Sequence, residues 1–85
     1  CRLADSVSVD RNSFVERMFD QGIGCSVHYI PLHLQPYWRD TYGLTAAMFP
    51  VSQRVYERTF SLPLHTRMTE ADSARVAVAV RNALR

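Results

Sequence analysis

Two histidines, His28 and His33, stand in the segment SVHYIPLHLQPYW, residues 26–38, which also holds three aromatic side chains and two prolines. A pair of imidazoles near the end of a strand could bind a metal ion. A structural metal site normally needs four ligands, however, and only Cys25 and the distant His65 could complete this one. We therefore expect no metal. The alternative for both histidines is a capped strand end, in which each ring hydrogen-bonds a carbonyl group of the loop.

The chain offers little scope for nucleophilic chemistry at cysteine and none for chemistry at lysine. Cys25 would need a neighbouring base to act as a nucleophile, but strand alternation would put His28 on the opposite face of the strand. A buried, small apolar role is the better interpretation of Cys25. All ten basic residues are arginine. An enzyme that forms a Schiff base needs a lysine amine. This chain cannot supply one.

The segment that carries the histidines begins as a strand. Alternation over residues 25–30 puts Cys25, Val27 and Tyr29 on one face, and the run ends at Pro31, which has no N–H to donate to a sheet. Tyr29 is therefore expected to pack inward, because it shares a face with Cys25 and Val27. His28 is expected to point in the opposite direction.

Helices and strands alternate along the rest of the chain. Met18 is expected in the buried stripe of the first helix. Val76, Val80 and Leu84, with Ala83 beside them, are expected to form that of the last. Capping residues, prolines at helix starts and glycines past helix ends predict four helices, within residues 10–22, 36–43, 49–59 and 69–84. Strand segments are expected at residues 1–3, 25–30 and 59–62. The fold class is therefore α/β (α+β), with a small, mainly antiparallel sheet of about three strands and helices packed on it.

Composition sets the class of molecule. The 85 residues are 47% hydrophobic and 21% charged, which fits one globular domain with one modest core. The formal net charge of +2 is scattered without a basic stripe, so we expect no nucleic-acid partner. No apolar run approaches the roughly 20 residues that cross a bilayer, and we expect no membrane partner. With only two cysteines, a cytoplasmic setting is expected.

Tyr37, Trp38 and Tyr42 are interpreted as the apolar face of a short surface helix.

Three segments, in this order and spacing, point to a known family. They are GIGCSVHYIPLHLQPYW, FPVSQRVYERTFSLPLH and MTEADSARV. From about Arg11 to Leu84 the chain resembles the C-terminal small domain of the DegT/DnrJ/StrS sugar aminotransferases, which are pyridoxal phosphate (PLP) enzymes of the aspartate aminotransferase fold. The resemblance implies that residues 1–85 form one domain, the C-terminal lobe of a larger homodimeric enzyme whose large PLP-binding domain is absent here.

The resemblance also implies an activity. The whole enzyme would transfer an amino group, with glutamate as the expected donor, to a keto-sugar attached to a nucleotide. The segment 27–33 matches the family motif at the edge of the cofactor and nucleotide-sugar pocket, which makes His28, His33 and Tyr29 the expected substrate-binding residues. His28 is the expected contact to substrate or to an ordered water.

The resemblance places the PLP cofactor mainly in the absent large domain, together with the lysine that this chain lacks. We therefore expect no catalytic residue in these 85 residues and no activity of the chain alone. One alternative is a stand-alone binding or interaction module that uses the aromatic and histidine loop 26–38. Another is a family member without the lysine that acts as a sensor or dehydratase.

Overall fold

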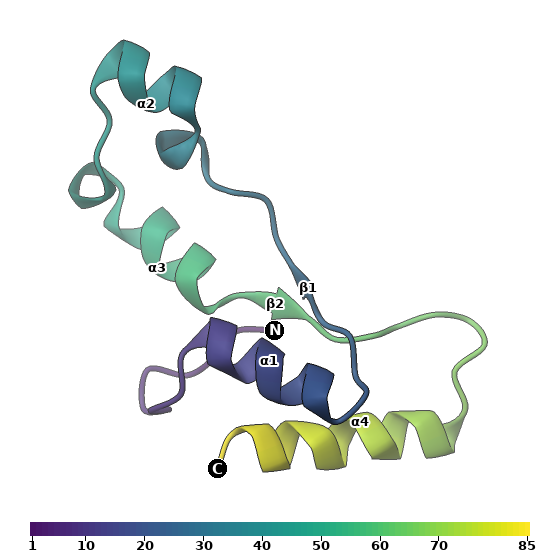
Figure 1. Cartoon of the computed structure of the whole chain (residues 1–85). Helices are drawn as coiled ribbons and strands as arrows, with labels where there is room; N and C mark the ends of the chain where they lie inside the picture. Colours follow the sequence, from purple (N-terminus) through teal and green to yellow (C-terminus); the bar gives the residue numbers. More distant parts are fainter.

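The computed structural model describes residues 1–85. Its elements are α1 (Arg11–Asp20), β1 (Ser26–Val27), the 3-10 helix η1 (Leu32–Leu34), α2 (Pro36–Tyr42), the 3-10 helix η2 (Ala46–Met48), α3 (Pro50–Arg58), β2 (Phe60–Ser61) and α4 (Glu70–Ala83). Figure 1 shows two parts set at an angle. The base, residues 1–27 and 59–85, holds the two strands, and α1 and α4 pack together below them. The arm, residues 28–58, contains η1, α2, η2 and α3 and projects away from the base.

Local capping explains where the longer helices begin. The carboxylate of Asp10 accepts hydrogen bonds from the backbone N–H and the hydroxyl of Ser13, at 2.9 and 2.8 Å. Thr69 and Asp72 form a reciprocal capping box at the start of α4. In the arm, α2 begins at Pro36 and ends at Gly43, whose φ of +61° is left-handed. These predicted helix boundaries are confirmed.

The sheet is smaller than the sequence predicted. β1 and β2 pair antiparallel, with Val27 opposite Phe60. The N-terminal segment adds only an isolated bridge between Arg2 and Thr59. The mixed fold class is confirmed, but the sheet has two strands instead of about three. Residues 28–30, expected within β1, fall outside it because there the chain leaves its partner strand and turns into the arm.

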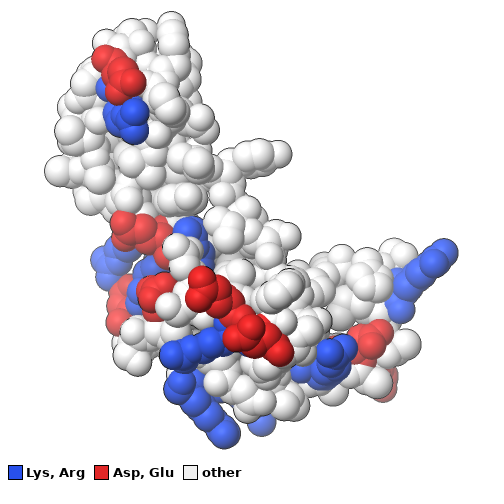
Figure 2. Space-filling model, in the orientation of Figure 1, with Lys and Arg blue, Asp and Glu red and all other residues white.

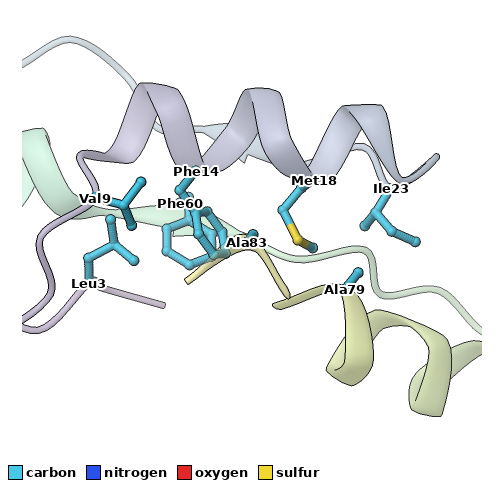
Figure 3. Close-up of a cluster of buried hydrophobic side chains, with 8 residues drawn as sticks. All are labelled: Leu3, Val9, Phe14, Met18, Ile23, Phe60, Ala79 and Ala83. Atoms are coloured by element: carbon cyan, nitrogen blue, oxygen red, sulfur yellow. The ribbon is translucent and has the colours of Figure 1, made fainter. Parts of the chain in front are cut away.

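The hydrophobic core lies entirely in the base (Figure 3). Its eight buried residues are Leu3, Val9, Phe14, Met18, Ile23, Phe60, Ala79 and Ala83. The rings of Phe14 and Phe60 have centroids 4.7 Å apart and join α1 to β2. Met18 is buried as expected. Of the stripe expected in α4, Ala83 is buried, but the expected burial of the larger residues is wrong, because Val76 and Val80 are only partly buried and Leu84 is exposed.

Small side chains explain this difference in α4. Ala79 and Ala83 face α1 in the core, and their methyl groups let the two helices approach closely. The larger valines lie on the flank of the contact. Cys25 also borders the core and is half-buried, and this burial raises the pKa of its thiol.

The molecule is extended for its length. Its radius of gyration is 15.5 Å, whereas a compact chain of this length has a radius near 12 Å on the order-of-magnitude rule. Its accessible surface is 6300 Å², against about 5,100 Å² for a compact monomer of this mass. The projecting arm accounts for this excess, and its apolar side chains are largely open to solvent. None of the helices combines the length and the apolar character that crossing a bilayer would need.

Candidate functional site

A cavity of about 470 Å³ opens between residues 28–31 and α3. Its lining residues are His28, Tyr29, Pro31, Ser52, Val55, Tyr56 and Thr59. We call it the arm cavity. It offers imidazole, phenol and hydroxyl groups beside apolar surface, which is the usual composition of a small-molecule site. Two of the three predicted substrate-binding residues, His28 and Tyr29, therefore lie at one cavity.

His28 is held from one side. Its Nε2 atom lies 2.8 Å from the Oγ atom of Ser61 in β2, so the two strands set the position of the ring. Nδ1 makes no hydrogen bond within the protein and remains able to bind a ligand. Whether Nδ1 donates or accepts depends on the tautomer, because the Ser61 hydroxyl can either donate to Nε2 or accept from it.

Tyr29 is 98% exposed, so the expectation that it packs inward is wrong. The alternation that placed it inward holds only within a strand, and β1 ends at Val27. Beyond that residue the chain turns toward the arm, and both His28 and Tyr29 line the arm cavity. Tyr29 thus remains a predicted substrate contact, with its whole side chain available.

His33 lies elsewhere than expected. Its side chain is buried, at 3% exposure, and it is not among the lining residues of the arm cavity. The ring stacks on Phe49 with centroids 5.1 Å apart, and Nε2 lies 2.7 Å from Oε1 of Gln53 in α3. The alternative interpretation, in which both histidines hydrogen-bond loop carbonyls, is also wrong, since their partners are the side chains of Ser61 and Gln53.

Ser61 and Gln53 carry no sequence signal that marks them as partners of the two histidines. Both are common polar residues that carry no motif, and each meets its histidine only through a contact between distant parts of the chain. Gln53 did have one readable signal. It lies four residues before Glu57 on α3, and its amide nitrogen donates to Oε1 of Glu57 at 2.7 Å.

The outer part of the arm is nearly free of charge. Residues 28–53 contain only one acid and one base, Arg39 and Asp40, which are neighbours and pair at 3.0 Å. Figure 2 shows them as the one red and blue group on the upper part of the molecule. The aromatic side chains of α2 pack on one another: Trp38 stacks on Tyr42 at 5.6 Å and meets the ring of Tyr37 at 5.2 Å. This surface is aromatic and overall neutral.

A charged joint connects the arm to the base. Asp5 pairs with Arg54 and, at 3.2 Å, with Arg58. Arg11, which is buried at the start of α1, donates to the carbonyl oxygen of Tyr56 at 2.5 Å and lies over the Tyr56 ring. These contacts satisfy the last turn of α3 and hold it against α1. We interpret this group as structural, because its guanidinium groups are already engaged by protein partners.

This chain offers few side chains that could bind a metal ion or a cofactor. No three side chains among His, Cys, Asp and Glu gather closely enough to hold a metal ion. The chain has no lysine, so its residues do not fit the covalent attachment of an aldehyde cofactor. What the site offers is hydrogen bonding and contact surface for a ligand.

The comparison with protein families decides the relationship of the chain. Residues 2–81 match the model of the DegT/DnrJ/EryC1/StrS aminotransferase family. The chain belongs to this family. Among its relatives, the uncharacterized protein MJ1066 of Methanocaldococcus jannaschii is 44% identical over 77 residues, which is 91% of this chain and 20% of that protein. The spore coat polysaccharide biosynthesis protein SpsC of Bacillus subtilis is 40% identical over 75 residues, 87% of this chain and 19% of SpsC.

The chain thus spans about a fifth of the length of these relatives of the aminotransferase family. The match runs through both parts of the molecule, since it includes α1, the whole arm and most of α4. The arm cavity and its histidine therefore lie within the region that the family shares.

Proposed function

We propose that this chain is the C-terminal small domain of a PLP-dependent aminotransferase that transfers an amino group from glutamate to a nucleotide-linked keto-sugar. The observation that carries the proposal is the arm cavity, with His28 and Tyr29 on its wall, in a chain of the aminotransferase family. The name of SpsC, which refers to polysaccharide biosynthesis, supports a sugar as the acceptor.

The role of this chain is to bind and orient the sugar. Nδ1 of His28 is free to hydrogen-bond a sugar hydroxyl or an ordered water, while Ser61 fixes the ring. Tyr29 and Tyr56 supply aromatic surface in the same cavity, and Ser52 and Thr59 are hydroxyl residues on the opposite wall. The arm cavity is an open hollow of about 470 Å³, a volume within the range of small-molecule sites.

PLP does not fit the residues of this chain alone, which lacks a lysine. When bound, the cofactor supplies the electron sink that amino-group transfer needs. We place its lysine and its main binding contacts in a large domain outside these 85 residues. The proposal accordingly assigns no catalytic step to this chain, which alone would be inactive.

The exposed surface of the arm is an argument that this chain forms part of a larger assembly. Its neutral, aromatic surface includes Tyr37 at 67% exposure and Tyr42 at 61%, and such contiguous apolar surface usually has a partner. In the proposed enzyme, which would be a cytoplasmic homodimer, the rest of the polypeptide and the second subunit would cover this surface.

The test is kinetic and uses the full-length protein. Replacing His28 by alanine removes the hydrogen bond of Nδ1, and we expect sugar-substrate affinity or turnover to fall about tenfold to a hundredfold. The melting temperature and the visible absorbance of bound PLP should change little, because the His28 side chain is exposed. His65→Ala, at another exposed histidine, is the control. Unaltered kinetics for His28→Ala would contradict its role as a sugar contact.

A second candidate function is a binding or interaction module, which the stacked, exposed aromatic residues of α2 favour. The same full-length protein distinguishes the two. Amino-group transfer to a nucleotide keto-sugar would support the enzyme, whereas a protein that lacks the PLP lysine and transfers nothing would favour the module, or a sensor or dehydratase.

A further inference from the structure

The two walls of the arm cavity are tied together at two places. One wall is the segment 28–33, and the other is α3 with the start of β2. Near the base, His28 meets Ser61 at 2.8 Å. Farther along that segment, His33 meets Gln53 at 2.7 Å, and Gln53 follows the lining residue Ser52 in α3, on the side nearer β2. Two side-chain hydrogen bonds therefore join the walls of the cavity, and each links a histidine of one wall to a polar residue of the other.

The hydrogen bond of His33 is the better protected of the two. His33 is buried at 3% exposure and stacks on Phe49, the residue just before α3. A buried imidazole that loses its partner must either stay unsatisfied or move toward water, and both are unfavourable. Loss of the Gln53 partner should therefore displace His33, and with it the segment that leads back to Tyr29 and His28.

Glu57 fixes the orientation of the glutamine amide. The Gln53 amide nitrogen donates to Glu57, so the amide oxygen is the atom that faces His33. In this arrangement Nε2 of His33 carries the proton and donates to that oxygen. The chain of hydrogen bonds runs in one direction, from His33 to Gln53 to Glu57, and a flipped amide would set its oxygen against the Glu57 carboxylate and break that link.

We propose that Gln53 is a positioning residue which, through His33, holds the segment 28–33 against α3 and so sets the width of the cavity in which His28 acts. This inference rests on the proposed function of the arm cavity. It assigns His33 a role different from the substrate contact that the sequence predicted. The ring binds the opposite wall, and the ligand meets His28 and Tyr29.

The experiment measures both half-reactions of the full-length protein, one with the amino donor and one with the nucleotide keto-sugar. For Gln53→Ala we expect KM for the sugar to rise about fivefold to fiftyfold, while the half-reaction with the amino donor stays unchanged. A general loss of structure would lower both together. Should Gln53→Ala not fold, Glu57→Ala replaces it, since this exposed residue only orients the amide. We expect Glu57→Ala to raise KM in the same direction but less.

A swapped pair provides the rescue. In Gln53→Glu with Glu57→Gln, the new carboxylate can accept from His33 and from the new amide, so KM for the sugar should return to within about twofold of the wild type. Gln21→Ala is the matched control, because this glutamine also joins two elements, donating to the carbonyl of Ala79 at 3.1 Å, but lies in the base. It should lower the melting temperature and leave the sugar KM unchanged.

The outcomes separate the two proposals. If His28→Ala raises the sugar KM but Gln53→Ala, or Glu57→Ala in its place, does not, the positioning role is overturned and the proposed function stands. Equal losses in both half-reactions, or a swapped pair no better than Gln53→Ala, would overturn it as well. If His28→Ala itself has no effect, the sugar site at the arm cavity fails and the inference fails with it.

Discussion

Asp10 and Asp72 each cap a helix of the base with an ionised carboxylate. Asp10 accepts from the N–H and the hydroxyl of Ser13, and these bonds lower its pKa. Asp72 accepts from the N–H of Thr69 at 3.0 Å, and its pKa is lowered mainly by hydrogen bonds from that residue. Because the charged form is favoured in the folded state, both groups contribute stability above the pKa of the unfolded chain, near 3.8. That stability is lost as the pH falls through the lower, folded pKa.

We therefore expect the free energy of unfolding to decrease as the pH falls below about 4. Asp10→Asn and Asp72→Asn should flatten this dependence, because asparagine still accepts the capping hydrogen bond but does not titrate there. Urea unfolding between pH 6 and pH 2.5 measures the effect. Asp20→Asn, at an exposed carboxylate of α1, is the control. Variants that retain the full wild-type acid dependence would show that these caps do not control it.

Such caps could be predicted from the sequence because their partners lie within three residues. The partners of His28 and His33 could not, since they lie 33 and 20 residues away. The family resemblance grouped His28, Tyr29 and His33 in one loop, and strand alternation wrongly separated His28 from Tyr29, whereas the burial of His33 depends on how α3 folds back over η1. That contact is tertiary and has no local pattern.

The packing of α1 against α4 shows where periodicity fails as a guide. Alanine and valine alternate through AVAV, residues 77–80, so several faces of α4 are apolar and the pattern does not select one. The prediction placed Val76 and Val80 in the buried stripe because valine is larger and more apolar than alanine. Close approach to Phe14 and Met18 selects the alanines instead, because their small volume is what the contact requires. The sheet shows the same limit of sequence patterns. The strand segments could be located from the sequence, but the lengths of the strands depend on which residues pair.

This contact gives a prediction for α4. Ala79→Leu adds a large side chain at a position 3% exposed, and we expect it to cost about 1–3 kcal/mol of stability through overpacking against α1. Val78→Leu, at the neighbouring position on the exposed face, should change stability by less than about 0.5 kcal/mol. Urea denaturation of both variants compares them. Equal effects would mean that the helix contact lies on another face of α4.

The two parts of the molecule differ in how they are stabilised. All eight core hydrophobic residues lie in the base, whereas His33 is the one buried residue of the arm. Few buried contacts and many exposed backbone groups are features of segments that open at low free energy. The arm is therefore expected to unfold before the base in the 85-residue chain.

Trp38 makes this difference measurable, since it is the one tryptophan of the chain and lies in the arm. We expect its fluorescence to change at a lower urea concentration than the circular dichroism signal, to which α1 and α4 contribute most helical residues. Amide hydrogens of α2 should also exchange faster than those of α1. Superimposable unfolding curves would instead indicate one cooperative unit. In the proposed enzyme, where the arm would be covered, the difference between the two unfolding curves should disappear.

The neutral outer arm has a consequence for how fast its contacts form. Arg39 and Asp40 lie side by side and pair with each other, so residues 28–53 project almost no electric field beyond their own surface. A surface of this kind cannot steer an approaching charged molecule. Association of the arm with the polypeptide that covers it should therefore proceed at a rate that is nearly independent of ionic strength. If the proposed nucleotide-linked sugar is the substrate, its phosphates have to be guided into place by arginines or other cations outside the outer arm.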